Sequence, residues 1–147
     1  MRANTLYQPW ASLWLTDRKV HETRPRALNY SGWLAVHAGK TFITDPDELG
    51  PELVDILNAE FGTGWAKALP TGGIIGAVNM VSCKRMADTA PASHDDEICG
   101  NWKPRRFALR RTEVIKLKEP IAFRGQQYLF PIPDWAASQI LNPAMAA

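Results

Sequence analysis

The chain has 147 residues, a length typical of one domain, and its 46% apolar and 10% aromatic residues are enough to form a hydrophobic core. No apolar run approaches the ~20 residues of a membrane-spanning helix, and the N-terminus lacks the apolar region of a secretory signal, so we expect a cytoplasmic protein that does not enter a membrane. The formal charge of +2 excludes no class of partner by itself.

The charges are distributed unevenly along the chain. Six acidic residues and no basic residue lie between Asp45 and Glu60, whereas seven basic residues and one acid lie between Lys103 and Lys118. This pattern predicts a negative side made of helices and a positive side made of strands, and a phosphate backbone would bind the second. A solvated charged surface without a ligand is the alternative interpretation.

Cysteine and histidine are too sparse for a disulfide framework or a zinc site. Cys83 and Cys99 are not in CxxC spacing, so we expect two free thiols. The three His and two Cys are scattered along the sequence, whereas zinc requires four clustered ligands. We therefore expect no metal and no cofactor.

In chain order, the first half of the sequence predicts three short strands and three helical segments. Trp10, Leu13 and Trp14 are spaced to share one face of a helix. Thr44-Asp45 provides the N-cap of a later helix, which Gly50-Pro51 divides into a short turn and a longer part. The strands are expected at 5–7, 19–24 and 33–37, with Gly39 ending the third, and the helices at 9–15, before residue 50, and at about 51–60.

The second half predicts more strands and a short terminal helix. After a loop at 62–73, residues 74–83 form the strongest strand candidate in the chain. Residues 84–101 are polar and are expected to form a long exposed segment, the best candidate for a mobile lid. Later strands are expected at 106–117 and 127–132. Between them we expect a turn at 119–120, a connection over 121–123 and a second turn at 124–126. Asp134 is expected to cap a helix over 135–141.

These elements predict a single domain over residues 1–147, with its core at about 5–135 and a short helix and tail at 134–147. Five to six strands and two to three helices in so short a chain favour an α+β fold whose sheet curls toward a barrel.

The most informative stretch is Lys19-x-x-Glu22-x-Arg24. On a strand, Glu22 and Arg24 share one face, and Lys19 lies on the other unless a bulge or the start of the strand realigns it. The Glu–Arg pair is either a salt bridge that holds a pocket wall or part of a binding site. In the second case Lys19 or Arg24 binds a phosphate, and Glu22 accepts hydrogen bonds from a base or acts as a general base.

Five motifs occur in a characteristic order: Gln8-Pro-Trp-Ala-Ser, Lys19-x-x-Glu22-x-Arg24, Trp33-Leu-Ala-Val-His-Ala-Gly-Lys40, Ile75-Gly-Ala-Val and Arg106-Phe-Ala-Leu. In this order they resemble the ASCH domain family of the PUA-like superfamily, whose signature is Gly-x-Lys-x-x-Glu-x-Arg. Asp17 stands here in place of the leading Gly, and Glu119-Pro-Ile-x-x-Arg-Gly-Gln is similar to the family's last hairpin. The resemblance covers about residues 6–135.

The resemblance implies a small PUA-like β-barrel of five to six strands, flanked by two to three helices, with a cleft lined by the strand over 19–24. It also implies that the chain binds RNA or nucleotides. Some members of the family look like ribonucleases, and one branch resembles amidohydrolases that deacylate N4-acetylcytidine with a Lys and a Thr in this motif. Here Glu22 occupies the position of that Thr and cannot supply a hydroxyl, and Thr23 is expected to point to the opposite face of the strand.

Other residues are weaker candidates for contacts with a nucleotide. Tyr30 and Trp102 could stack on bases, Lys40 and Arg106 could contact phosphates, and His37 is either a structural histidine or a ligand contact. His21 is expected at an exposed position or on a strand face, and Trp10, Trp14 and Trp33 in the core. The acidic run at 95–97 is either a solvated loop or a site for a divalent ion that would support nuclease chemistry.

Two hypotheses follow, and both concern a monomer. The first is an RNA- or nucleotide-binding domain with a basic pocket around Lys19, Glu22 and Arg24. The second is a hydrolase, a ribonuclease or an amidohydrolase that acts on modified nucleosides, in which Lys19 and Glu22 are catalytic. A structural or regulatory domain with a vestigial pocket is a third, less specific interpretation.

Overall fold

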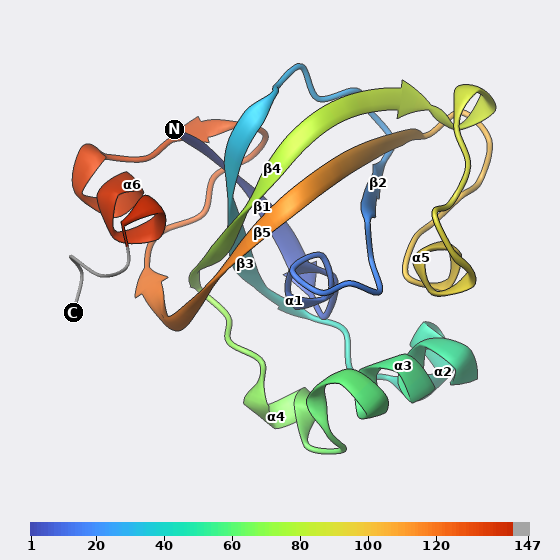
Figure 1. Cartoon of the computed structure of the whole chain (residues 1–147). Helices are drawn as coiled ribbons and strands as arrows, with labels where there is room; N and C mark the ends of the chain where they lie inside the picture. Colours follow the sequence, from blue (N-terminus) through green and yellow to red (C-terminus); the bar gives the residue numbers. More distant parts are fainter. Residues whose placement is uncertain (143–147) are drawn as a thin grey trace.

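The computed structural model describes residues 1–142 and shows an α+β fold built on one six-stranded mixed sheet (Figure 1). The strands are β1 (Arg2–Gln8), β2 (His21–Arg24), β3 (Gly32–Phe42), β4 (Gly73–Arg85), β5 (Phe107–Ala122) and β6 (Phe130–Pro131). The helices are α1 (Trp10–Leu13), α2 (Pro46–Leu49), α3 (Pro51–Phe61), α4 (Trp65–Ala68), α5 (His94–Ile98) and α6 (Asp134–Leu141), with a 3₁₀ turn, η1 (Met86–Asp88). The prediction of two to three helices was therefore too low. Four of the six helices have only four or five residues, which is too short to show a clear helical periodicity in the sequence.

The sheet has the strand order β2-β5-β4-β3-β1-β6 and curls around a core (Figure 1). β3, β4 and β5 pair antiparallel, whereas β1 lies parallel to β3. Within residues 1–142 the backbone of the edge strand β2 pairs with neither β1 nor β6, the strands at the other edge, so the sheet does not close into a barrel. A side-chain hydrogen bond of 3.0 Å from Arg24 Nη1 on β2 to Asn4 Oδ1 on β1 crosses the opening.

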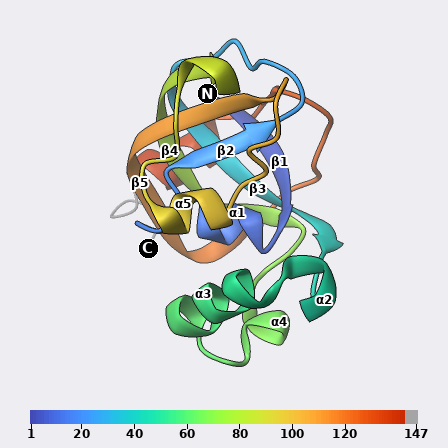
Figure 2. The same cartoon turned by 90° about the vertical axis from the view of Figure 1, so that its right-hand side faces the viewer.

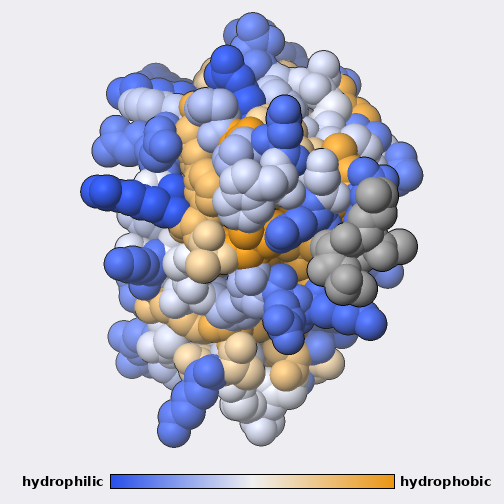
Figure 3. Space-filling model, turned by 90° about the vertical axis from the view of Figure 1, so that its left-hand side faces the viewer, coloured by the Kyte–Doolittle hydropathy of each residue, from blue (hydrophilic) through white to orange (hydrophobic). Residues whose placement is uncertain are grey.

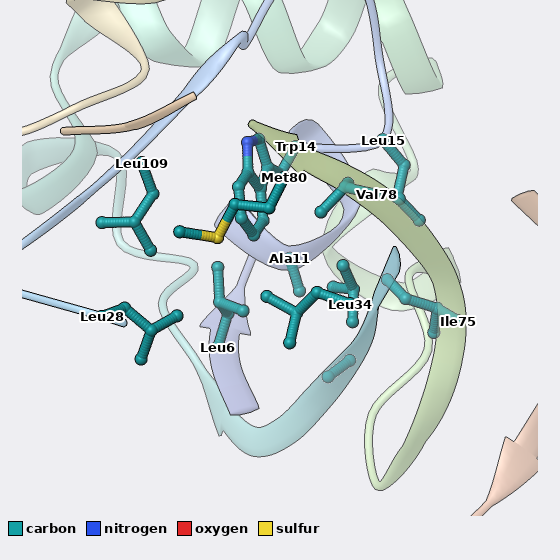
Figure 4. Close-up of a cluster of buried hydrophobic side chains, with 12 residues drawn as sticks. Leu6, Ala11, Trp14, Leu15, Leu28, Leu34, Ile75, Val78, Met80 and Leu109 are labelled. Carbon is teal, nitrogen blue, oxygen red and sulfur yellow. The ribbon is translucent and has the colours of Figure 1, made fainter. Parts of the chain in front are cut away.

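Three apolar clusters hold the elements together. The first fills the inside of the curl, where Trp14, just after α1, packs against Met80, Leu34 and Leu109 of three different strands (Figure 4). The second lies under α6, and the third joins α3 and α4 to α1. Burying one such side chain contributes roughly 1.5–3 kcal/mol, so α1 is held mainly by tertiary packing rather than by its own four residues.

β1, β3, β4 and β5 are longer than the sequence predicted, whereas β2 and β6 are shorter than the strands expected at 19–24 and 127–132. The physical reason is clearest for β3 and β5. β3 continues through Gly39, where a Cβ atom would lie 2.9 Å from Thr5 Cγ2 of the parallel strand, so this glycine permits close strand approach instead of ending the strand. β5 continues through Pro120 because its register with β4 shifts: Lys116 pairs with Gly76, and Ile121 pairs with Ile74. The extra residues of β5 bulge there, and Pro120 needs no ladder donor.

The helices and loops also show where local sequence signals succeeded and failed. Gly50 separates α2 from α3, and Asp45 caps α2, as predicted. α4 lies in the stretch expected to be a loop at 62–73. The segment 84–101 is not simply an exposed excursion, because it contains η1 and α5 and contributes the fully buried Asp96 and Cys99.

At the C-terminal end, α6 begins at Asp134, but Pro133 occupies its N-cap position, and Asp134 is therefore not the cap. Hydrophobic residues reach the surface on the side of the molecule where α6 lies (Figure 3), and Trp135 of this helix is 52% exposed. The predicted tail over 143–147 lies outside the described residues. In the described part of the chain, no helix is long and apolar enough to cross a bilayer.

Candidate functional site

A cavity of about 460 Å³ lies between β1, β2, the helices α2 and α3, and the segment that follows α5. These elements face the viewer in Figure 2. The residues that line the cavity include apolar, aromatic, hydroxyl, amide and charged side chains: Thr5, Leu6, Tyr7, Trp10, Glu22, Thr23, Arg24, Pro25, Glu48, Leu49, Leu53, Ile98, Cys99, Gly100, Asn101 and Arg106. A volume of this size lies in the range of small-molecule sites.

Glu22 presents a nearly buried carboxylate to this cavity, with 8% of the residue exposed. Its Oε1 accepts a hydrogen bond of 3.1 Å from the Thr23 backbone N–H and lies 3.2 Å from Lys19 Nζ. Its Oε2 lies 3.9 Å from Arg24 Nη1 and accepts no hydrogen bond from residues 1–142. One carboxylate oxygen is thus fixed by the protein, and the other remains free to accept a hydrogen bond from a ligand.

Lys19 is fully buried beneath Glu22. It precedes β2, which begins at His21, and so it escapes the alternation of the strand, and its Nζ reaches Glu22 Oε1. The same Nζ donates a hydrogen bond of 2.8 Å to the carbonyl oxygen of Cys99. Because Lys19 has no exposed surface, it orients and neutralises Glu22 in this structure and does not itself touch the contents of the cavity.

Two arginines that line the cavity, Arg24 and Arg106, have N–H donors that residues 1–142 leave unused. Arg24 uses Nη1 to bind Asn4, and Arg106 uses Nε and Nη2 to bind the carbonyl oxygens of Asn101 and Thr23. A guanidinium carries five N–H donors, so each arginine keeps donors that no residue in the described range accepts. Asn4 itself is 2% exposed, and its Nδ2 has no partner within residues 1–142.

Two aromatic side chains contribute to the walls. Tyr7 on β1 is 57% exposed, and Trp10 of α1 is half-buried. Trp10, Trp14 and Trp33 were expected in the core, but only Trp14 of the three is fully buried. Trp10 and Trp33 are half-buried at the edges of apolar clusters, and Trp10 also borders the cavity. The cavity therefore offers π-surface as well as charge, a combination that suits a planar ring.

Behind the cavity, a buried His21–Asp96 pair fastens α5 to the start of β2. Asp96 Oδ1 accepts hydrogen bonds from the backbone N–H groups of Val20 and His21, and Oδ2 accepts from His21 Nδ1 at 2.7 Å and from the Ala92 N–H. Burial alone would raise the pKa of Asp96, but the bond from the His21 ring, followed by the amide bonds and the His21 charge, lowers this pKa from 3.8 to about 2.

This pair corrects two predictions. His21 lies on strand β2, one of the two positions expected for it, but it is 1% exposed and therefore not a surface residue. Asp96 is fully buried, so it does not belong to a solvated loop, and it is not part of an ion site among the described residues. Trp102 packs edge-to-face on the His21 ring at 5.3 Å, and its indole Nε1 donates to the Asp96 carbonyl oxygen. Cys99 directly follows α5, so the His21–Asp96 pair also fixes the position of the Cys99 carbonyl oxygen, which accepts the hydrogen bond from Lys19 Nζ.

The thiol of Cys99 is not a nucleophile at neutral pH. Burial raises its pKa to about 11 despite the opposing charge of Lys19. Thr23, whose side chain was expected on the face opposite Glu22, accepts a hydrogen bond from the Asn101 N–H through Oγ1. Among the described residues, no cluster of three His, Cys, Asp or Glu side chains could hold a metal ion.

The cavity gathers some of the residues singled out from the sequence and leaves others outside. Glu22, Arg24 and Arg106 line it, and Lys19 lies directly beneath. The remaining candidates, Tyr30, His37, Lys40 and Trp102, are not among the lining residues. Tyr30 donates to the Trp33 carbonyl oxygen, Lys40 is exposed on β3, and His37 donates through Nε2 to the Phe123 carbonyl oxygen while its Nδ1 lies 3.1 Å from Thr5 Oγ1.

Several lining residues were not anticipated from the sequence, notably Tyr7, Glu48 and Asn101. Tyr7 carried a usable signal, because a tyrosine in a short strand next to Leu6 must face away from the side that Leu6 buries. Glu48 and Asn101 carried none, since they reach the cavity only through the packing of α2 and of the segment after α5.

Comparison with models of known protein families and with curated proteins gives no match. The resemblance to ASCH domains therefore rests on the five motifs in the sequence.

Proposed function

We propose that the chain is an ASCH-type, PUA-like domain that binds RNA or a nucleotide in the cavity between β1 and β2. One observation carries this proposal: a nearly buried carboxylate with one free oxygen lies 3.9 Å from an arginine that keeps free donors, in a cavity with aromatic walls. A nucleotide offers the complementary groups, namely base N–H donors, a planar ring and a phosphate.

Each group of the ligand has a natural partner in this arrangement. Glu22 Oε2 accepts a hydrogen bond from a base N–H or amino group, and such charge-assisted bonds are roughly twice as strong as neutral ones. Arg24 and Arg106 bind phosphate oxygens with their free donors. Tyr7 or Trp10 provides a ring for stacking.

Glu22 enters the cavity as an anion beside Arg24, whereas Lys19 stays covered. We therefore assign Lys19 a positioning role and assign direct contact with the ligand to Glu22, Arg24 and Arg106. Asn4 does not line the cavity, but its Oδ1 accepts a hydrogen bond of 3.0 Å from Arg24 Nη1 and so helps to orient this guanidinium.

The proposal is tested by titrating the protein at low salt with the four nucleoside 5′-monophosphates and with short RNA oligomers, followed by calorimetry or by tryptophan fluorescence. We expect saturable binding that Arg24→Ala and Arg106→Ala weaken by about 10- to 100-fold, the value of a hydrogen bond to a charged group. Arg110→Ala is the matched control, because Arg110 is exposed on β5 and does not line the cavity. The absence of saturable binding for every ligand would refute the proposal.

A hydrolase is the second candidate, and the position of Glu22 favours it. A carboxylate with one oxygen fixed by Lys19 and the other open to the cavity is placed as a general base for an attacking water. Incubation with RNA and with N4-acetylcytidine, with and without a divalent metal, tests this alternative. Turnover that disappears in Glu22→Gln while the variant remains folded would establish it, and absence of turnover in the unaltered protein would exclude it for these substrates.

A further inference from the structure

Outside the cavity, Arg26 and Tyr128 form an exposed pair, and neither side chain belongs to the three apolar clusters. Arg26 Nη1 donates a hydrogen bond of 2.8 Å to Tyr128 Oη, and the guanidinium carbon lies 5.8 Å from the centre of the ring. Both residues are exposed, and Tyr128 is 57% accessible. One face of the ring is covered by the guanidinium, and a base can reach the remainder.

The backbone holds Tyr128 in an uncommon conformation. Its φ of +59° lies in the left-handed region, which non-glycine residues with bulky side chains adopt rarely and at a cost. The cost is not offset by burial, because more than half of the side chain remains in water. Strained residues with exposed side chains are often found at functional sites.

The pair lies next to the cavity rather than on a separate surface. Arg26 is two residues beyond Arg24 and directly follows Pro25, and both of these line the cavity. Two residues of extended chain span at most about 7 Å. The backbone of Arg26 therefore lies within about 7 Å of the backbone of Arg24, at the edge of the cavity. Figure 2 shows the loop after β2 and the segment between β5 and β6 on the side of the molecule that carries β1 and β2.

The charge of these two segments suits a polyanion. Residues 25–31 and 123–129 contain Arg26 and Arg124 and no acidic residue. Arg124 is exposed, like Arg26. A basic surface that carries an accessible aromatic ring and continues from a cavity is the arrangement by which proteins bind successive nucleotides of a single strand.

We infer that Arg26 and Tyr128 form a second subsite, which binds the nucleotide adjacent to the one in the cavity, so that the preferred ligand is single-stranded RNA rather than a mononucleotide. Tyr128 stacks on the adjacent base, and Arg26 contacts the phosphate between the two nucleotides. This inference rests on the proposed binding of a nucleotide in the cavity.

The test compares each nucleoside 5′-monophosphate with the RNA trinucleotide of the same base. We expect the trinucleotide to bind more tightly by about 5- to 150-fold, the contribution of one stacked base. Tyr128→Gly should remove this advantage and leave mononucleotide affinity unchanged, and it should fold well because glycine suits a positive φ. Tyr128→Phe keeps the ring and should retain most of the advantage.

Arg26→Ala tests the phosphate contact through its salt dependence. Each phosphate contact on a single strand contributes about 0.7 to the slope of log K against log salt. The slope for the trinucleotide should therefore fall by about 0.7 in Arg26→Ala, and it should not change in Arg110→Ala.

The failure of this inference can be told apart from the failure of the proposed function. If mononucleotides and trinucleotides bind equally, or if Tyr128→Gly leaves the trinucleotide advantage intact, the cavity binds a nucleotide but the second subsite does not exist. If neither ligand binds the unaltered protein, the proposed function fails, and the second subsite fails with it.

Discussion

The buried Lys19–Glu22 pair allows a quantitative prediction, because replacement of one partner leaves the other without its counter-charge. Lys19 Nζ lies 3.2 Å from Glu22 Oε1, and with an effective dielectric constant of about 20 this separation corresponds to an attraction of about 5 kcal/mol. Desolvation of both groups opposes this attraction, so the net contribution of the intact pair is far smaller. Loss of one partner removes the attraction but leaves the second charge buried.

We therefore expect Lys19→Met to lower the free energy of unfolding by about 3–5 kcal/mol. This change also removes the hydrogen bond of 2.8 Å to the Cys99 carbonyl oxygen. The double variant Lys19→Met/Glu22→Gln should be more stable than Lys19→Met alone by about 2 kcal/mol, because a neutral amide at position 22 needs no counter-charge.

The measurement is equilibrium unfolding in urea, followed by tryptophan fluorescence, for the unaltered protein, the two single variants and the double variant. Lys67→Met is the control, because Lys67 is exposed on α4, and it should change stability by no more than about 0.5 kcal/mol. A cost below about 1 kcal/mol for Lys19→Met, or single-variant costs that simply add in the double variant, would show that the pair is not coupled as the structure indicates.

Three further predictions concern the surroundings of the cavity. The pKa of Asp96 is lowered from 3.8 to about 2, which corresponds to a contribution of about 2 kcal/mol to the free energy of unfolding. This contribution should be complete above about pH 4 and should be lost as the pH falls toward 2. In Asp96→Asn, this pH-dependent loss of stability should be absent from an acid-unfolding curve. Cys99, fully buried and with its pKa raised to about 11, should react with iodoacetamide at pH 8 only after unfolding, whereas half-buried Cys83 should react in the native protein; equal rates in mass spectrometry would contradict the burial of Cys99. Gly76→Ala should destabilise the fold by more than about 1 kcal/mol, because its Cβ would collide with the Ile115 carbonyl oxygen of the neighbouring strand, and an unchanged melting temperature would show that the two strands separate easily.

Local chemistry in the sequence predicted the elements whose causes are themselves local. Asp45 accepts a hydrogen bond from the Asp47 N–H, and Gly50 with φ of +87° divides two helices, so a cap and a glycine were enough to place α2 and α3. The strong strand at 74–83 was equally clear, because its apolar run is buried between β3 and β5. Boundaries failed where a distant strand decided them, as at Gly39 and Pro120.

The candidate site was only partly predictable for a related reason. Glu22 and Arg24 share a strand face by simple alternation, and the Arg24 side chain indeed reaches across to β1. The partner of His21, by contrast, is 75 residues away, and no local signal distinguishes Asp96 from the acidic residues beside it. The sequence therefore indicated the charged strand but not the buried pair that fixes the wall behind it.

The sequence by itself determined most of the strands, the helices α1, α2, α3 and α6, and which residues of β2 face together, because periodicity and capping act over a few neighbouring residues. Only the tertiary structure decided that Lys19 is covered, that Trp10, Glu48 and Asn101 border one cavity with Glu22, and that Arg26 meets Tyr128. These contacts join positions tens of residues apart, and they arise when the sheet curls and α2, α3 and α5 pack beside it.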